Sequence, residues 1–203
     1  TRCLDRLKRT GRVKDVDFRE LIVKRRSIRE FEQRPVEVDV VRQVISDSVM
    51  APSARNAQPW SFSVVMDKDL IRRLSDESKR NILWDMDQNP TSTYGAYRAV
   101  LEDANFHVFY NAPCVVYISG PKDVRSIQVD CALAGAYFML AAADRGLGTC
   151  WVDLGSAIRD KALRRELGLG DDRVIVATLA VGYPKTIPEA PPRAQPRILR
   201  IVA

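Results

Sequence analysis

The segment that most constrains the fold of this chain is Ile127–Asp144, an alanine-rich stretch that is apolar nearly all round. A helix without a polar face belongs in the interior of a domain, and Gly146 just beyond it is a residue type that readily ends helices. Apolar runs at residues 114–118, 148–152 and 174–181 predict strands buried in a sheet. We therefore expect a central helix packed against a sheet.

Three further segments show helical patterns. Apolar residues recur at helical spacing over residues 18–24, 38–50 and 156–167. Pro52 ends the second of these segments and Gly168 ends the third. These segments are predicted to be helices.

The remaining patterns are shorter. Residues 60–64 alternate as a half-buried strand does, and residues 70–74 suggest a short helix. From Pro184 onward the tail holds five of the eleven prolines, which excludes regular structure from most of it. Residues 198–202 are candidates for an edge strand. The intermixed strands and helices predict an α+β, or mixed α/β, class.

The length and composition fit one globular domain. The chain has 203 residues, which we divide into an N-terminal extension at 1–16 and a single domain at 17–203. With 46% hydrophobic and 29% charged residues, disordered and collagen-like classes are excluded. No apolar run is judged to reach the roughly 18 residues of a spanning helix, so no membrane partner is expected. The start is polar and basic and lacks the apolar core of a signal peptide, although a lost targeting segment before Thr1 stays open.

The net charge and the few histidines and cysteines limit the classes of function that this chain can have. The net charge of +6 indicates a solvated basic surface or attraction of anionic ligands such as phosphates. Nucleic acid is not expected, because the basic residues are spread out and form no known module. A single histidine, His107, argues against a histidine metal site or a Ser-His-Asp triad. The cysteines show no metal spacing and favour a reducing cytoplasm; they are Cys3, Cys114, Cys131 and Cys150.

The first candidate motif is Arg25-Arg26-Ser27-Ile28-Arg29, at the end of a predicted helix. Three guanidinium groups and a hydroxyl can hold a phosphate through charge-assisted, bidentate hydrogen bonds. Basic residues at a helix end also complement the helix dipole, so the motif alone leaves both interpretations open.

The second motif spans residues 51–60, Ala-Pro-Ser-Ala-Arg-Asn-Ala-Gln-Pro-Trp, between a predicted helix and a predicted strand. Pro52 and Pro59 restrict the backbone around residues that carry amide donors and acceptors. A planar heterocycle with carbonyls and ring nitrogens suits such a loop. The alternative interpretation is an ordinary helix end followed by a turn.

The third motif spans residues 145–153, Arg-Gly-Leu-Gly-Thr-Cys-Trp-Val-Asp. Its glycines allow the backbone to approach a ligand closely, although Gly146 is equally explained as a helix cap.

Taken in this order, the three motifs resemble the nitroreductase family of FMN enzymes. Asn111-Ala112-Pro113 before an apolar strand and Gly182-Tyr183-Pro184 before a basic, proline-rich tail complete the pattern. The resemblance runs from about residue 18 to residue 196. It implies a central, mostly antiparallel sheet flanked by helices, a homodimer, and a C-terminal arm that reaches the partner subunit.

The resemblance also implies where FMN is held. One group would bind the phosphate and the adjoining part of the cofactor: Arg25, Arg26, Ser27 and Arg29, with Arg193, or in its place Arg197, returning from the tail. A second group would come from the other subunit to meet the ring and ribityl chain: Pro52, Ser53, Ala54, Asn56 and Gln58. A third group would lie against the ring and offer backbone N–H groups: Trp151, Val152, Asp153 and Leu154. Many relatives carry two glycines, or Glu-Gly, where this chain has Asp153-Leu154, so the contacts there are left open.

The activity implied is hydride transfer from NADH or NADPH to FMN and on to an acceptor such as a nitroaromatic or a quinone. The flavin carries the chemistry, so no catalytic side chain and no metal are expected. Alternatives are specialised flavin chemistry, such as reductive dehalogenation or flavin fragmentation, and a non-catalytic FMN-binding protein. Residues 81–97 are polar and aperiodic and are expected to be an irregular lid whose Trp84 and Tyr94 contact the substrate.

Overall fold

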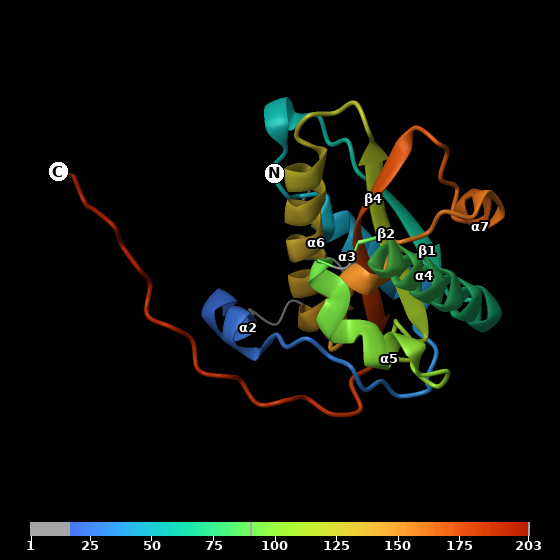
Figure 1. Ribbon diagram of the computed structural model, residues 1–203. Helices are drawn as coiled ribbons and strands as arrows, with labels where there is room; N and C mark the ends of the chain where they lie inside the picture. Colours follow the sequence, from blue (N-terminus) through green and yellow to red (C-terminus); the bar gives the residue numbers. More distant parts are fainter. Residues whose placement is uncertain (1–16, 90, 203) are drawn as a thin grey trace.

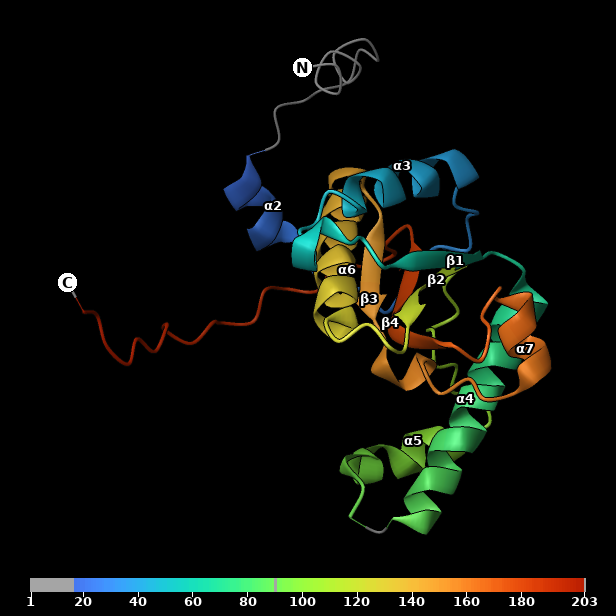
Figure 2. The same cartoon turned by 90° about the horizontal axis from the view of Figure 1, so that it is seen from above.

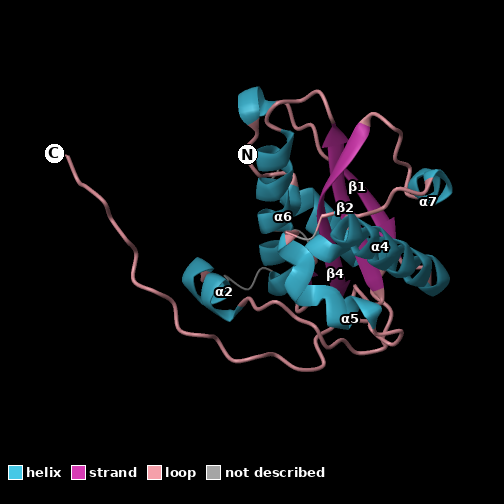
Figure 3. Ribbon diagram, in the orientation of Figure 1, coloured by secondary structure: helices cyan, strands magenta, loops and turns pink. Residues whose placement is uncertain are grey.

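The computed structural model describes residues 17–89 and 91–202, and four strands within them form one antiparallel sheet (Figure 3). In sheet order the strands are β1 (Ser61–Val65), β2 (Cys114–Pro121), β4 (Arg173–Gly182) and β3 (Gly148–Trp151). β2 and β4 share the longest ladder, in which Tyr117 lies opposite Thr178. The predicted α+β class with a mostly antiparallel sheet is confirmed.

Helices cover both faces of the sheet (Figures 1 and 2). They are α3 (Val38–Ser48), α4 (Lys68–Gln88), α5 (Arg98–Glu102), α6 (Ile127–Asp144) and α7 (Lys161–Glu166). Val116 and Ile118 of β2 belong to the core beneath α3 and α6, whereas Val115 and Tyr117 belong to the core on the α4 side. β2 is therefore buried on both faces, which explains its unbroken apolar sequence.

α6 is the predicted central helix, with the predicted bounds. It buries Cys131, Ala134 and Phe138 but exposes 62% of Val129 and 41% of Tyr137. In length and composition it meets the requirement for a membrane-spanning helix, so the expectation that no run is long enough is wrong. Its packing against three strands of the sheet is that of a core helix. The opposite side of α6 keeps large apolar side chains at the surface.

The expectation that residues 81–97 are irregular is wrong, because α4 continues as a helix to Gln88. Its buried side runs on through Ser75 and Ser78 to Ile82. The Ser75 hydroxyl accepts from the Val108 N–H at 3.0 Å, and the Ser78 hydroxyl donates to the Leu154 carbonyl at 2.5 Å. These serines interrupt the apolar pattern because they bond to chain segments crossing the helix.

After α4 the chain turns through a short helix, η2 (Thr93–Tyr97), into α5. Directly after β3 the chain passes through another short helix, η3 (Asp153–Gly155). α7 begins only at Lys161, later than the predicted start at 156, because the Asp160 side chain accepts from the N–H groups of Ala162 and Leu163 and caps the helix there.

The two ends of the described chain lie at the surface. α2 (Phe18–Lys24) buries none of its residues, and it lies near the C-terminal end of α6 in Figure 1. Every residue of the tail from Lys185 to Val202 is exposed. No strand forms at 198–202, so the edge-strand prediction is wrong, and Figure 2 shows the tail leading away from the body. The predicted extension at 1–16 lies outside the described residues.

Candidate functional site

The segment that carries the arginine motif lies along the free edge of β3. Ser27 forms a parallel bridge with Thr149, and the Ile28 N–H donates to the Thr149 carbonyl at 2.9 Å. Phe31 forms a second bridge, to Pro184 at the end of β4. Ile28 and Phe31 are buried, and Ser27 beside them is half-buried. Two apolar anchors therefore hold the motif against the sheet.

The glycines of the third motif have structural roles within the chain. Gly146 has a φ of +75°, in the left-handed region that suits a glycine after a helix. At Gly148, a Cβ atom would lie 2.6 Å from the Ile28 side chain. A residue larger than glycine at 148 would therefore displace the arginine segment. Gly146 therefore ends a helix and Gly148 allows close packing against Ile28, while a close approach of these glycines to a ligand stays a prediction.

The arginines of the motif gather positive charge at one end of β3. Burial lowers the pKa of Arg25, and repulsion from Arg26 and Arg193 lowers it further. The tail thus brings Arg193 near Arg25. Among the described residues, no carboxylate forms an ion pair with any of these three arginines. Such a cluster is suited to an anion that neutralises it.

Arg29 lies against the Tyr110 ring. Its guanidinium lies 5.8 Å from the centre of the Tyr110 ring, and a hydrogen bond with the Tyr110 side chain raises the pKa of Arg29. Burial raises the pKa of the Cys150 thiol, while the charges of Arg29 and Arg25 act to lower it. Cys150 on β3 therefore lies near both arginines.

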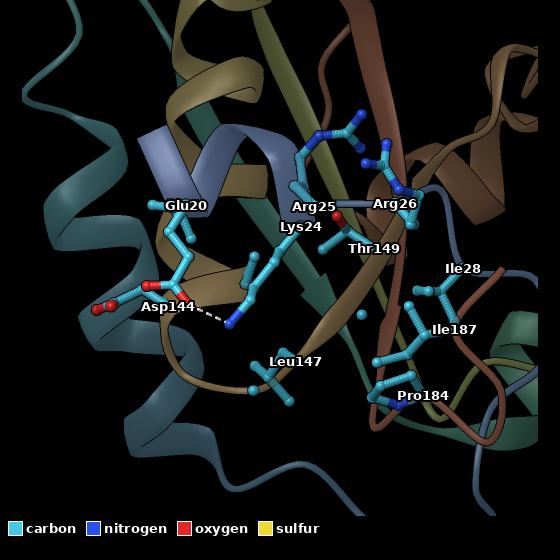
Figure 4. A pocket seen from close by; sticks show the side chains of 14 residues that line it. Glu20, Lys24, Arg25, Arg26, Ile28, Asp144, Leu147, Thr149, Pro184 and Ile187 are labelled. Atoms are coloured by element: carbon cyan, nitrogen blue, oxygen red, sulfur yellow. Dashed lines mark hydrogen bonds and ion pairs between the residues drawn. The ribbon is translucent and has the colours of Figure 1, made fainter. Parts of the chain in front are cut away.

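A pocket of about 420 Å³ lies behind the arginines, between α2, the end of α6 and the start of the tail. Figure 4 shows Arg25 and Arg26 directing their guanidinium groups to one side, away from Leu147, Pro184 and Ile187. Charged groups thus border an apolar hollow.

The loop at residues 51–60 is held in a strained conformation at the first turn of α6. Arg55, Asn56 and Gln58 all have positive φ, between 48° and 55°, which is costly for residues with a side chain. The Ala54 N–H donates to Asp130 Oδ1 at 3.0 Å, and the Gln58 side chain donates to Asn56 Oδ1 at 3.0 Å.

One more hydrogen bond closes this loop. The Ser53 hydroxyl accepts from the Gln58 N–H at 3.0 Å. Pro52, Ala54, Asn56 and Gln58 are exposed, and Ser53 is half-buried. Asp130, which fixes the loop, was not identified from the sequence. A carboxylate in the first turn of an otherwise apolar helix was the signal that could have found it.

The arginine motif and the strained loop lie at opposite ends of α6 (Figure 1). The loop is tied to Asp130 in the first turn, and the arginine motif pairs with β3 just after the helix ends. The 18 residues of α6 span roughly 27 Å at 1.5 Å per residue. One chain therefore does not bring its two motifs together.

The end of β3 presents the third predicted group. The Trp151 ring packs on α6, where a Cβ atom at Gly135 would lie 2.8 Å from it. The Val152 N–H donates to the Thr178 carbonyl at 2.8 Å, so this predicted N–H donor is already used within the sheet. Leu154 is buried, whereas Asp153 between them is exposed.

Of the two predicted substrate residues, Tyr94 reaches this group. Its hydroxyl donates to Asp153 Oδ2 at 2.6 Å, and this bond raises the pKa of Tyr94 to about 12. Trp84 lies elsewhere, on α4, with its ring 5.6 Å from the Arg159 guanidinium. A further tyrosine, Tyr97, is close enough that its phenolate, once ionised, raises the pKa of Arg29.

Comparison with known proteins finds relatives in sequence and in fold. A candidate NADH dehydrogenase/NAD(P)H nitroreductase of Archaeoglobus fulgidus is 26% identical over 172 residues, covering 82% of this chain and 84% of that protein. A nitroreductase of Bacteroides fragilis, solved with bound FMN, superposes with a TM-score of 0.77 at 20% identity, covering 93% of this chain and all of that one. Rat iodotyrosine deiodinase 1 is 39% identical over only 71 residues, a quarter of its length.

The first relative covers most of both chains, and the solved structure shows that the fold is shared. A family model described as the nitroreductase family matches residues 22–183. That range contains the arginine motif, the strained loop, η3 and the end of β4. The chain therefore belongs to the nitroreductase family.

Proposed function

We propose that this chain is an FMN-dependent oxidoreductase that takes hydride from NADH or NADPH and passes it to a small-molecule acceptor, such as a nitroaromatic or a quinone. The observation that carries this proposal is the cluster of Arg25, Arg26 and Arg193, which has no carboxylate partner within the described residues. A cofactor phosphate, with a charge of about −2, would neutralise it. The FMN bound in the similar solved structures supports this assignment.

The residues present fit such a cofactor. Arg25, Arg26, Ser27, Arg29 and Arg193 would hold its phosphate end. FMN supplies the hydride chemistry when bound, so the protein has only to bind, orient and shield it. The Trp151 backbone and the peptide N–H groups of Asp153 and Leu154 would lie against the ring, since the Val152 N–H is already bonded to Thr178.

The active form is a homodimer in this proposal. Because the two motifs lie at opposite ends of α6, a helix roughly 27 Å long, the loop of one copy would complete the site of the other. Pro52, Ser53, Ala54, Asn56 and Gln58 would then face the flavin held by the partner. A two-fold axis makes two equal sites in this way.

Exposed apolar surface supports this assembly. Val129 and Tyr137 on α6 are joined by Phe18 and Val23 on α2. The C-terminal arm adds Ile198, Leu199, Ile201 and Val202, each more than two-thirds exposed. Surface of this kind marks an interface in a soluble protein. We expect an obligate interface above about 2,000 Å² in total.

The compartment proposed is the reducing cytoplasm. Cys114, Cys131 and Cys150, the cysteines within the described part of the chain, are free and buried. Buried thiols of this kind behave as small apolar side chains and need no oxidising environment.

The decisive experiment measures flavin and turnover together. The purified protein should be yellow and should release FMN on denaturation. NADH and NADPH oxidation should depend on an added acceptor across a panel of nitroaromatics, quinones and halogenated phenols. A protein that takes up no FMN on reconstitution contradicts the proposal. A yellow protein that oxidises neither nicotinamide in the presence of any acceptor supports a non-catalytic flavin-binding role.

A further inference from the structure

The two ends of the candidate site carry opposite charge. Arg25, Arg26 and Arg193 gather at one end, and β3 leads from there past Cys150 to Asp153. The Asp153 carboxylate is exposed, and it forms no ion pair with any described lysine or arginine. Its bonded side-chain partner is the neutral Tyr94 hydroxyl. The negative charge there is therefore uncompensated.

The nearby charges do not cancel it. Asp85 lies close enough to Tyr94 to influence it but is itself paired with Arg159. Arg29 lies against Tyr110 and forms no ion pair with Asp153. Asp153 thus provides the net charge that an approaching ligand meets at this end of the site.

The position of Asp153 is fixed by the packing of its neighbours. The Leu154 carbonyl accepts from the buried Ser78 hydroxyl at 2.5 Å. A Cβ atom at Gly155 would lie 2.4 Å from the Phe109 ring, so the turn is tightly packed there. The Tyr94 hydroxyl holds the carboxylate from the other side at 2.6 Å. The carboxylate is therefore set on a rigid turn and cannot swing away from a ligand without breaking this bond.

We infer that Asp153, oriented by Tyr94, selects the electron acceptor by charge: neutral and cationic aromatic acceptors are used, and anionic ones are disfavoured. This inference rests on the proposed function and deepens it. A unit charge roughly 6 Å from the carboxylate changes binding about 3-fold in a water-like dielectric and about 100-fold in a partly buried one. We expect about tenfold for each charge step. Because Asp153 is exposed, the preference weakens as salt is added.

The test uses three acceptors that share one ring and differ in charge: 4-nitrobenzoate, 4-nitrobenzyl alcohol and 4-nitrobenzyltrimethylammonium. The ratios of their kcat/KM values within one protein are independent of flavin content. In the wild type the cation should be used best and the anion worst. Asp153→Asn keeps an acceptor for the Tyr94 hydroxyl but removes the charge, so it should bring the three values within about threefold of each other.

Two further variants separate charge from position. Tyr94→Phe removes the hydrogen bond and keeps the charge, so the preference should weaken but keep its order. Asp171→Asn removes an exposed carboxylate in the turn before β4 and should leave the ratios unchanged. A binding readout free of turnover uses the unreactive benzoate, benzyl alcohol and benzyltrimethylammonium. Their dissociation constants, taken from shifts in flavin absorbance, should follow the same order.

The outcomes distinguish this inference from the proposed function. A protein that binds no flavin overturns both. A yellow, active enzyme that uses the anion as well as the cation overturns the charge selection alone. The same conclusion follows if Asp153→Asn retains the wild-type ratios, or if Asp171→Asn changes them as much as Asp153→Asn does.

Discussion

The backbone N–H of Ala54 donates to Oδ1 of Asp130 across 3.0 Å, and this bond ties an exposed, strained loop to the first turn of α6. Asp130 is 2% exposed and also accepts from the Ser126 hydroxyl at 2.7 Å. A carboxylate buried in this way keeps its place through the hydrogen bonds it receives. The loop geometry at Arg55, Asn56 and Gln58 therefore depends on a residue outside the loop.

We predict that Asp130→Ala loosens this loop and lowers both stability and FMN retention. Two donors lose their buried partner, which costs about 1–3 kcal/mol of unfolding free energy. For a chain of this size the melting temperature falls by about 2–10 °C. Thermal unfolding and flavin content after gel filtration measure the two effects. Asp123→Ala, in the exposed turn before α6, is the control. Equal losses in the two variants would contradict the role given to Asp130.

The phosphate assignment is tested by Arg25→Ala combined with Arg29→Ala. Each charge-assisted hydrogen bond lost costs about 1.5–3 kcal/mol, so FMN affinity should fall at least tenfold. Arg42→Ala combined with Arg72→Ala removes the same charge from exposed positions on α3 and α4. That control should keep its flavin. Unchanged dissociation constants for FMN in the first double variant would reject the assignment.

The Tyr94–Asp153 bond has a consequence at alkaline pH. The bond raises the pKa of Tyr94 from the usual value of 10.0 to about 12, so the native state holds this proton more tightly than the unfolded chain. The stabilisation is complete below pH 10 and is lost as the pH rises through about 12. Ultraviolet titration of phenolate should therefore show no contribution from Tyr94 near pH 11, and wild type and Tyr94→Phe should match there. Asp153→Asn should gain about one phenolate at the same pH. A Tyr94 that ionises near pH 10 in the wild type would refute the predicted shift.

Assembly is tested on the exposed side of α6. Tyr137→Glu places a charge in the proposed interface and should convert the dimer to a monomer with loss of FMN, because the shared site needs both copies. Val64→Glu, at an equally exposed apolar position on β1, should remain dimeric. Sedimentation at micromolar concentration separates the two states. A wild type that sediments at the mass of one chain would contradict the shared site.

The sequence predicted the sheet and the central helix well, because their signals are local. The continuous apolar runs of β2 and β4 and the all-round apolar pattern of α6 follow directly from burial on two faces. α4 was predicted too short because Ser75 and Ser78 interrupt its apolar stripe, and their partners, Val108 and Leu154, are distant in the sequence. The start of α7 was missed for a local reason, the cap at Asp160.

The candidate site was also predicted only where its signals are local. The motifs themselves were found, but the contacts that position them were not, because each joins segments far apart in the sequence. Gly148 meets Ile28, and Asp153 meets Tyr94. Neither pair has a spacing pattern that periodicity could reveal. The resemblance to relatives with two glycines, or Glu-Gly, in place of Asp153-Leu154 left the contacts at that position open.

The length of α6 has a further consequence for which parts of the chain can lose or gain residues. An insertion of one residue rotates the rest of a helix by about 100° and advances it by 1.5 Å. In α6 this would move Asp130 relative to the start of β3, and under the two-fold arrangement it would do so at two sites at once. An insertion in the turn between α4 and α5 would not change the position of Asp130 relative to the start of β3. Insertions and deletions are therefore expected to accumulate in that turn and to be absent from α6. Acceptor preference can then diverge among relatives while the helix that spaces the two cofactor-binding motifs keeps its length.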